Sequence, residues 1–378
     1  MSKIEVRKLY KIFGPEPGKA LEKLKAGMSK EDLLQKMGHT VGVCDVSFSV
    51  EQGEIFVVMG LSGSGKSTLV RCLNRLIEPT AGEVLIDGEV ITGLSPEQLR
   101  LFRQKKMSMV FQRFALFPHR TILQNVAYGL EIQGMAKQER EERALDVLAT
   151  VGLKEWGSVY PDQLSGGMQQ RVGLARALAV DPDILLMDEP FSALDPLIRK
   201  EMQEELSELQ SNMQKTIVFI THDLDEALKL GDRIAIMKDG QIVQLGTPEE
   251  ILTNPCTEYV ANFVNGVDRS RVLKAENIMI RPSALVKETD GPRLALRKMK
   301  EEELSSIFVV GEGRTLRGIV TVDRAVEAVN KKEKDLRNII DEDIPLTSPD
   351  VTLLDLIPMA ITAKVPIAVV NENRKLLG

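Results

Sequence analysis

The residues best placed to do chemistry form a run of glycines and hydroxyl side chains that ends in a lysine. The run GLSGSGKST, Gly60 to Thr68, follows a short apolar segment and opens a helical pattern. Glycines let backbone N–H groups curl around phosphate oxygens, and a helix N-terminus adds partial positive charge. There Lys66 would bridge the terminal phosphates and Ser67 would ligate Mg²⁺. The expected phosphate-site residues are Gly60, Ser62, Gly63, Ser64, Gly65, Lys66, Ser67 and Thr68.

Two carboxylates end a second apolar run. Asp188 and Glu189 follow ILLM, and the C-terminal end of a strand in an α/β sheet lies at the ligand crevice. Asp188 would hold Mg²⁺ through water, and Glu189 would orient or polarise an attacking water. The alternative is a solvated acidic pair, which the neighbouring phosphate motif disfavours.

One of the chain's three histidines follows a further apolar run. The context of His222 is ITHD, which suggests a phosphate contact. The other two, His39 and His119, are expected to be ordinary surface or core residues, as isolated histidines usually are.

A second helix N-terminus offers another anion site. In LSGGMQQR, Leu164 to Arg171, the residues Ser165, Gly166 and Gly167 open a helical pattern. Backbone N–H groups at such a terminus bind anions. One chain therefore carries two half-sites for phosphate.

The order of these motifs resembles that of the ATP-binding-cassette ATPases. The phosphate loop, Gln112 in VFQ, the LSGG signature, the acidic strand end, SALD (Ser192 to Asp195) and His222 follow one another as in that family. The resemblance covers roughly Ile4 to Val264. It implies ATP and Mg²⁺ as cofactors, and a catalytic set of Glu189, His222, Gln112 and Lys66.

The same resemblance implies a homodimer that closes head to tail. ATP would lie between the phosphate loop of one copy and Ser165 to Gly167 of the other, with Asp195 among the nucleotide-site residues. Gln112 would sense the γ-phosphate or join Ser67 and Asp188 as a metal ligand. Adenine usually stacks on an aromatic residue near the first strand, and Phe13 is our first choice, Tyr10 the second.

Strand and helix patterns predict the elements that carry these residues. Buried-strand candidates at 54–60, 184–190 and 216–223 alternate with helical patterns, which predicts an α/β fold with a largely parallel sheet. We expect a P-loop NTPase core with an antiparallel edge sheet, together spanning residues 1–265. A helical subdomain at about 115–180 and a helical insertion at about 14–40 interrupt it.

Composition excludes several classes of protein. A net charge of −6 gives no support to nucleic-acid binding. Cys44, Cys72 and Cys256 lack metal-ligand or disulfide spacing, so we expect buried apolar residues in a reducing compartment. The N-terminus lacks a signal-peptide pattern, and no apolar run is long enough to span a membrane. We expect a cytosolic chain, or one held at a membrane by partners.

Longer stretches of the sequence resemble the ATPase subunit of glycine betaine/proline importers. The stretches GEIFVVMGLSGSGKSTLVRCLNRLIEPTAGEVLIDG and YPDQLSGGMQQRVGLARALAVDPDILLMDE carry this likeness. It implies integral membrane permease subunits, a substrate-binding protein or domain, and a peripheral place on the cytoplasmic face of a bacterial membrane. Aromatic residues are 4% of the chain, so an aromatic cage for a quaternary ammonium ion must belong to another subunit.

Two other functions stay open at this stage. One is an importer of another small solute, such as an amino acid. The other is a soluble cassette ATPase of DNA repair or translation, although those usually carry two cassettes or a long coiled coil.

An internal repeat occupies the end of the chain. VVGEGRTLRG at 309–318 aligns without a gap with VVNENRKLLG at 369–378. Residues 266–378 resemble tandem CBS modules of α+β fold, which implies an adenine nucleotide or cyclic di-AMP in the cleft; a structural dimerisation appendage is the alternative. The second copy stops where the first continues, so we expect the natural protein to be longer by about one strand and helix.

A basic run in the repeat region suggests a second regulatory contact. Lys331, Lys332 and Lys334 could bind an anionic lipid surface, and rising salt would release them. The alternative is a solvated helix end that Glu333 and Asp335 neutralise.

Overall fold

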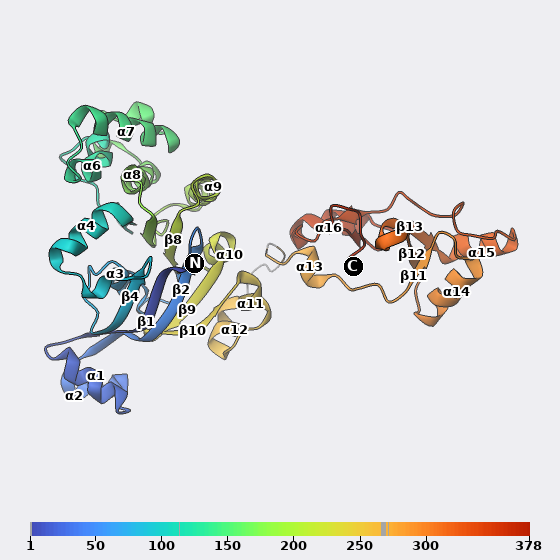
Figure 1. The fold of residues 1–378 in the computed structure, drawn as a ribbon, viewed down its shortest axis with the longest axis horizontal. Helices are drawn as coiled ribbons and strands as arrows, with labels where there is room; N and C mark the ends of the chain where they lie inside the picture. Colours follow the sequence, from blue (N-terminus) through green and yellow to red (C-terminus); the bar gives the residue numbers. More distant parts are fainter. Residues whose placement is uncertain (1, 113, 266–269, 271) are drawn as a thin grey trace. The chain divides into compact units, whose positions relative to one another are not determined.

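A six-stranded sheet forms the centre of the first of two structural units (Figure 1). The computed structural model describes residues 2–112, 114–265, 270 and 272–378, without the side chains of 211 and 212. The units span Met1–Val267 and Asp268–Gly378, and each is described by itself. The predicted boundary at 265/266 borders residues 266–269, which lie outside the described residues.

The central sheet is parallel except at one edge. Its strand order is β10-β9-β3-β8-β7-β6, and only β10 runs antiparallel to its neighbour. Every residue of β3, β7 and β8 is buried, as expected for apolar strands covered on both faces. The strands are β3 (Ile55–Met59), β6 (Met107–Val110), β7 (Ile184–Asp188), β8 (Thr216–Thr221), β9 (Arg233–Lys238) and β10 (Gln241–Gly246).

Helices between these strands position the chemistry at their C-terminal ends. Short 3₁₀ turns lie at Ile91–Gly93, Lys154–Trp156 and Pro161–Gln163. The helices between these strands are α3 (Lys66–Leu73), α4 (Pro96–Lys106), α9 (Pro196–Met213) and α10 (Leu224–Leu230); α11 (Pro248–Thr253) and α12 (Glu258–Val264) follow the last strand, β10.

An antiparallel sheet of order β2-β1-β4-β5 completes the core. Its strands are β1 (Ser2–Phe13), β2 (Thr40–Glu51), β4 (Ala81–Ile86) and β5 (Glu89–Val90). Between β1 and β2 the chain forms two helices, α1 (Pro17–Lys25) and α2 (Lys30–Met37), which lie together in Figure 1. Ile12, Ala20 and Leu33 form their small core. The predicted α/β class with an antiparallel edge sheet is confirmed.

A group of helices with its own apolar core follows β6. They are α5 (Ile122–Val126), α6 (Tyr128–Ile132), α7 (Lys137–Thr150) and α8 (Gly166–Ala179), and α6, α7 and α8 group together in Figure 1. The buried Asn125 holds the entry loop, because its side chain accepts from Phe117 N at 2.8 Å and donates to Phe117 O, Arg120 O and Thr121 O.

The second unit builds one pattern twice. β11 (Leu285–Lys287) pairs in parallel with β12 (Ser306–Val310), and α14 (Pro292–Glu301) connects them. In the same way β14 (Leu346–Thr347) pairs in parallel with β15 (Ala368–Val369), and α16 (Leu353–Thr362) connects them. The other elements are α13 (Ala275–Ile278), a 3₁₀ turn at Glu312–Arg314, β13 (Leu316–Thr321) and α15 (Val322–Asn330).

The two repeats bind each other through equivalent residues. Leu316 N donates to Arg374 O at 2.9 Å, and Leu376 N donates to Arg314 O at 3.0 Å. Each member of one bond stands 60 positions from its counterpart in the other. Arg314 and Arg374 also share a left-handed backbone, with φ of 66° and 53°. The repeats therefore meet across a local pseudo-twofold axis.

Two further observations bear on the expectations from composition. Cys44 and Cys72 are buried as expected, but Cys256 is exposed, because it lies in the connection between α11 and α12 rather than on an inward face. Within the part of the chain that the structure describes, no helix has the length and apolar character needed to cross a bilayer.

Candidate functional site

The glycines of the phosphate loop are required by close backbone contacts. Gly60 has φ of 150° and Gly65 has φ of 98°. A Cβ added at Gly60 would lie 2.3 Å from Met237 O, and one at Gly65 would lie 2.2 Å from Gly42 O. The loop is therefore pressed between β2 and β9, in a conformation that only glycine adopts readily.

Lys66 opens α3 directly behind the loop. Its residue is 4% exposed, and its Nζ donates to Gly60 O at 2.7 Å and to Leu61 O at 3.0 Å. Burial lowers the pKa of Lys66, and the carboxylates of Glu189 and Asp188 oppose that shift. The ammonium is thus held under the loop, with two carbonyls that a phosphate could replace as partners.

Ser67 and Asp188 meet where the predicted metal would lie. Ser67 Oγ donates to Asp188 Oδ1 at 2.8 Å, and Arg71 Nη2 lies 3.2 Å from Asp188 Oδ2. The hydroxyl of Ser64 is buried without a hydrogen-bond partner among the described residues. Sequence reasoning missed Arg71, since a helical arginine carries no signal of its own.

Glu189 is the centre of the polar contacts at the strand ends. Its Oε2 accepts from Gln112 Nε2 at 3.1 Å and lies 3.2 Å from His222 Nδ1. Its Oε1 lies 3.9 Å from Lys66 Nζ. The structure thus brings together all four residues of the predicted catalytic set. Gln112 contacts Glu189 and Ser192 Oγ, the latter at 3.4 Å, rather than the pair of Ser67 and Asp188.

The backbone of Glu189 is itself unusual. Its φ is 46°, in the left-handed region that side chains other than glycine rarely adopt. Its N–H donates to Ile220 O at 3.1 Å, which ties it to the neighbouring strand β8. Such local strain persists where the surrounding structure fixes it, often at functional sites.

Phe13 ends β1 beside the phosphate loop. Its residue is 39% exposed, so it is not a core residue. A Cβ added at Gly42 would lie 2.8 Å from Phe13 Cε2 and 3.2 Å from Thr68 Cγ2, so the ring and the end of the GLSGSGKST run both lie close to that glycine. Tyr10, the second choice, is 9% exposed and packs under Lys25. Of the two rings, Phe13 is the one available to a ligand.

The LSGG signature lies at the start of α8. Ser165 caps this helix, with its Oγ accepting from Met168 N at 3.3 Å. Gly167 packs on α9, since an added Cβ would lie 2.5 Å from Ile198 Cγ2. The signature belongs to the helical group, whereas the phosphate loop belongs to the sheet core (Figure 1).

Asp195 caps the helix that follows it. Its Oδ1 accepts from Leu197 N at 3.2 Å and from Ile198 N at 3.1 Å. This contact stabilises the N-terminus of α9.

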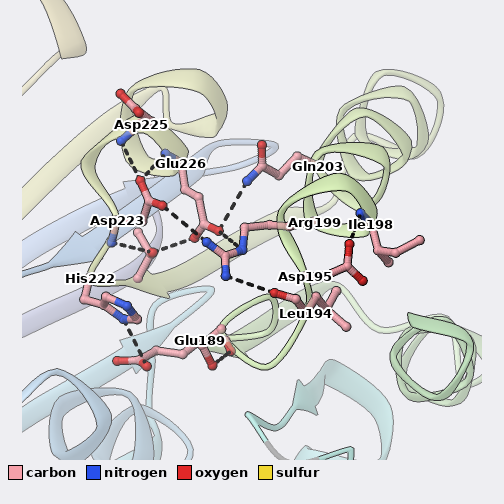
Figure 2. A network of polar contacts seen from close by, with 12 residues as sticks. Glu189, Leu194, Asp195, Ile198, Arg199, Gln203, His222, Asp223, Asp225 and Glu226 are labelled. Atoms are coloured by element: carbon pink, nitrogen blue, oxygen red, sulfur yellow. Dashed lines mark hydrogen bonds and ion pairs between the residues drawn. The ribbon is translucent and has the colours of Figure 1, made fainter. Parts of the chain in front are cut away.

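A buried polar network that sequence reasoning missed lies behind His222. Figure 2 shows Glu226 of α10 between Arg199 and Gln203 of α9. Glu226 stands four positions after His222 in the sequence, in the first turn of α10, whereas His222 precedes that helix. Its partners on α9 could not be found from the sequence, because the contact is tertiary.

Comparison with known proteins decides the family. The sequence model for the ABC transporter family matches residues 43–192, and that for the CBS domain matches residues 275–331. The glycine betaine/carnitine transport ATP-binding protein GbuA of Listeria monocytogenes is 57% identical over 378 residues, covering 100% of this chain and 95% of GbuA. This chain belongs to the ABC transporter family. Within it, the chain groups with the ATP-binding proteins of glycine betaine transport.

Other members of that group match this ABC protein over its whole length. The glycine betaine transport ATP-binding protein OpuAA of Bacillus subtilis is 56% identical, covering 100% of this chain and 90% of OpuAA. ProV of Salmonella typhimurium, named for glycine betaine and proline betaine transport, is 52% identical, with 100% and 94% covered. The family resemblance expected from the sequence is confirmed.

A solved structure matches the nucleotide-binding unit. The ATP-binding cassette MJ0796, in a dimeric post-hydrolysis state bound to ADP and Pi, is 34% identical to this ABC protein. The match has a TM-score of 0.55 and covers 65% of this chain and 98% of that one. The P-loop fold is confirmed, and ATP is the ligand of the domain.

Proposed function

We propose that this chain is the ATP-hydrolysing subunit of an importer for glycine betaine and related compatible solutes. The observation that carries the proposal is the match of the whole chain, CBS region included, to three ATP-binding proteins named for betaine transport. An importer of another small solute is the alternative; a soluble cassette ATPase does not account for this full-length likeness.

The chain's own residues divide the work of hydrolysis. Lys66 and the loop amides bind the phosphates, and Glu189 orients a water for attack while Gln112 and His222 hold its carboxylate in place. Loss of the γ-phosphate then removes the contacts that keep two copies closed.

The site also fits Mg²⁺, held by Ser67 with Asp188 acting through water and Gln112 reaching the ion on closure. Among the described residues, no group of three or more His, Cys, Asp or Glu side chains could hold a metal ion. Mg²⁺ keeps several waters and binds substrate phosphates, so a site for it needs few protein ligands. When bound, the ion would neutralise charge on the β- and γ-phosphates.

The proposed partners follow from the same likeness. Two copies would close with Ser165, Gly166 and Gly167 of one copy over the ATP of the other; the dimeric state of MJ0796 supports this arrangement. The pair would act on the cytoplasmic face of a bacterial membrane, below integral permease subunits served by a substrate-binding protein or domain.

Transport in vesicles tests the proposed function. The chain would be reconstituted with its membrane partner, and ATP-driven uptake of labelled glycine betaine, proline and carnitine would be compared under varied salt. We expect betaine uptake only when ATP is present on the side of the vesicle membrane where this subunit is bound. Uptake of an amino acid in preference to all three would favour the alternative importer.

Phe13 is proposed to stack on adenine. Stacking of a base on an aromatic ring contributes about 1–3 kcal/mol, so Phe13→Ala should weaken ATP binding by about 5- to 150-fold. Phe13→Trp should retain most of the affinity, since it keeps an aromatic face. Fluorescent-nucleotide titration gives both dissociation constants. Equal affinity of Phe13→Ala and the unaltered chain would exclude the stacking role.

The CBS region is proposed to bind an adenine nucleotide or cyclic di-AMP. A cavity of about 690 Å³ lies between its repeats, with Ile307 and Phe308 from one copy and Leu356 and Val369 from the other among its mostly apolar lining. Such a wall suits a planar base.

Calorimetric titration can separate this cavity from the ATP site. The full chain carrying Gly65→Ala, which should disable the phosphate loop, would be titrated with ATP, AMP and cyclic di-AMP. We expect heat from at least one ligand, and none after Ala284→Trp fills the cavity wall. Absence of heat from all three would leave the dimerisation appendage as the better account.

The basic run is proposed to contact anionic lipid. Lys331 is paired with Glu327 at 2.7 Å, a contact that raises the pKa of Lys331. Replacing Lys331, Lys332 and Lys334 by alanine should reduce salt activation of transport in anionic vesicles, since screening acts on these charges. The control replaces Lys19, Lys23 and Lys25 of α1, which removes the same charge elsewhere. Identical salt activation of both variants would contradict lipid sensing.

A further inference from the structure

A buried carboxylate lies in the first turn of α10, the helix that begins two residues after His222. Glu226 is 5% exposed and accepts hydrogen bonds from Thr221 Oγ1 at 2.5 Å and from Gln203 Nε2 at 3.2 Å. Burial raises the pKa of Glu226, and the hydrogen bond from Thr221 opposes that shift. A buried carboxylate is unfavourable unless its partners stay in place. The groups around Glu226 are therefore tightly constrained.

Two of these constraints fall on the neighbours of His222 in the chain. Thr221 Oγ1 donates to Glu226 and accepts from Asp223 N at 3.0 Å. Asp223 caps α10, with its Oδ1 accepting from Asp225 N at 2.9 Å and from Glu226 N at 3.3 Å. The residues on both sides of His222 are thus held by hydrogen bonds, and Figure 2 shows the contact of Asp223 with Asp225.

Arg199 connects this region to the SALD run. Its Nη2 donates to Leu194 O at 3.0 Å, while its Nη1 lies 3.7 Å from Asp223 Oδ2 and its Nε 3.9 Å from Glu226 Oε1. That Nε is buried and has no hydrogen-bond partner among the described residues. A movement of about 1 Å would turn the pair with Glu226 into a hydrogen bond.

These contacts, together with short stretches of the chain, form a closed ring that includes Glu189, the carboxylate proposed to activate water. From Glu189 one branch runs to His222 and on through Thr221 to Glu226. The other branch runs through Gln112 to Ser192 Oγ, two residues before Leu194. Arg199 is the side chain that joins the two branches.

We propose that Arg199 and Glu226 are positioning residues. They hold His222 against Glu189 and fix the position of His222 relative to the SALD run. The inference rests on the proposed catalytic roles of Glu189 and His222. It assigns to this pair an effect on turnover that involves no contact with the nucleotide.

The test compares two disrupting variants with a matched control in the full-length chain. Arg199→Met and Glu226→Gln each remove the charge attraction. The control is Lys229→Met, because Lys229 Nζ lies 3.6 Å from Glu204 Oε1 and also bridges α10 and α9. We expect each disrupting variant to lower kcat for ATP hydrolysis about fivefold or more, with KM for ATP within about twofold. The control should keep the kcat of the unaltered chain.

A double-mutant cycle with His222→Ala separates positioning from mere stability. If Arg199 acts through His222, Arg199→Met should add no further loss of kcat to His222→Ala. An equal fold-loss in both backgrounds would overturn the inference, as would a kcat per folded molecule that stays unchanged while Tm falls. A chain without ATPase activity would overturn the proposed function and this inference together. An active chain sensitive to His222→Ala but indifferent to Arg199→Met would overturn the inference alone.

Discussion

Glu189→Gln should bind ATP, form a stable dimer and hydrolyse almost nothing. Glutamine keeps the shape of the side chain and its contacts with Gln112 and His222, but it cannot accept a proton from water. A positioned general base contributes about 10²- to 10⁴-fold to rate, so kcat should fall by at least about 100-fold. Phosphate release measures kcat, and light scattering with ATP measures the dimer.

The matched control for this variant is Glu83→Gln on the edge sheet. Glu83 is 52% exposed at its side chain and lies on β4, outside every motif of the site, so the kcat of this variant should stay unchanged. Hydrolysis by Glu189→Gln within about tenfold of the unaltered chain would contradict the role of general base.

Gly65→Ala should strongly weaken nucleotide binding. The added Cβ would meet the rigid carbonyl of Gly42 at 2.2 Å, and φ of 98° is unfavourable for alanine. The left-handed backbone alone costs about 1–2 kcal/mol, and overpacking adds about 1–3 kcal/mol. The loop must then rearrange. We expect the Kd for ATP to rise by about 30-fold or more, since about 1.4 kcal/mol corresponds to tenfold.

Gly63→Ala in the same loop separates the clash from the backbone preference. Gly63 has φ of 81°, but nothing lies within 4 Å of an added Cβ. Its loss of affinity should therefore reflect only the backbone cost of about 1–2 kcal/mol. Fluorescent-nucleotide titration and thermal unfolding of both variants make the comparison. Equal losses at the two positions would show that the contact with Gly42 is unimportant.

The parts of the site that could be predicted are those whose residues are contiguous. The phosphate loop needs its glycines next to Lys66 because a single turn must wrap an anion, and so the run itself carries the information. The acidic pair and His222 each follow an apolar strand, and parallel strands bring their ends to one edge. The four-residue catalytic set could be assembled on that basis.

The remaining features could not be predicted from the sequence because they depend on tertiary structure. Arg199 and Glu226 lie on helices whose sequence patterns do not single them out. Only the packing of α9 on α10 brings the two residues together. The left-handed backbone of Glu189, which accompanies its bond to Ile220 of the neighbouring strand, also has no sequence signal. Cys256 was predicted to be buried from residue type alone, but its loop leaves it exposed.

The reciprocal backbone bonds between the repeats lie among residues that match between the two copies. Arg314, Leu316 and Gly318 match Arg374, Leu376 and Gly378. Leu316 and Leu376 are both buried where one copy forms the other's surroundings. A residue that faces outward contacts only solvent and its own copy. At such an axis, a substitution in one copy changes the environment of the equivalent residue in the other copy. A substitution at either leucine is therefore expected to disturb both repeats at once.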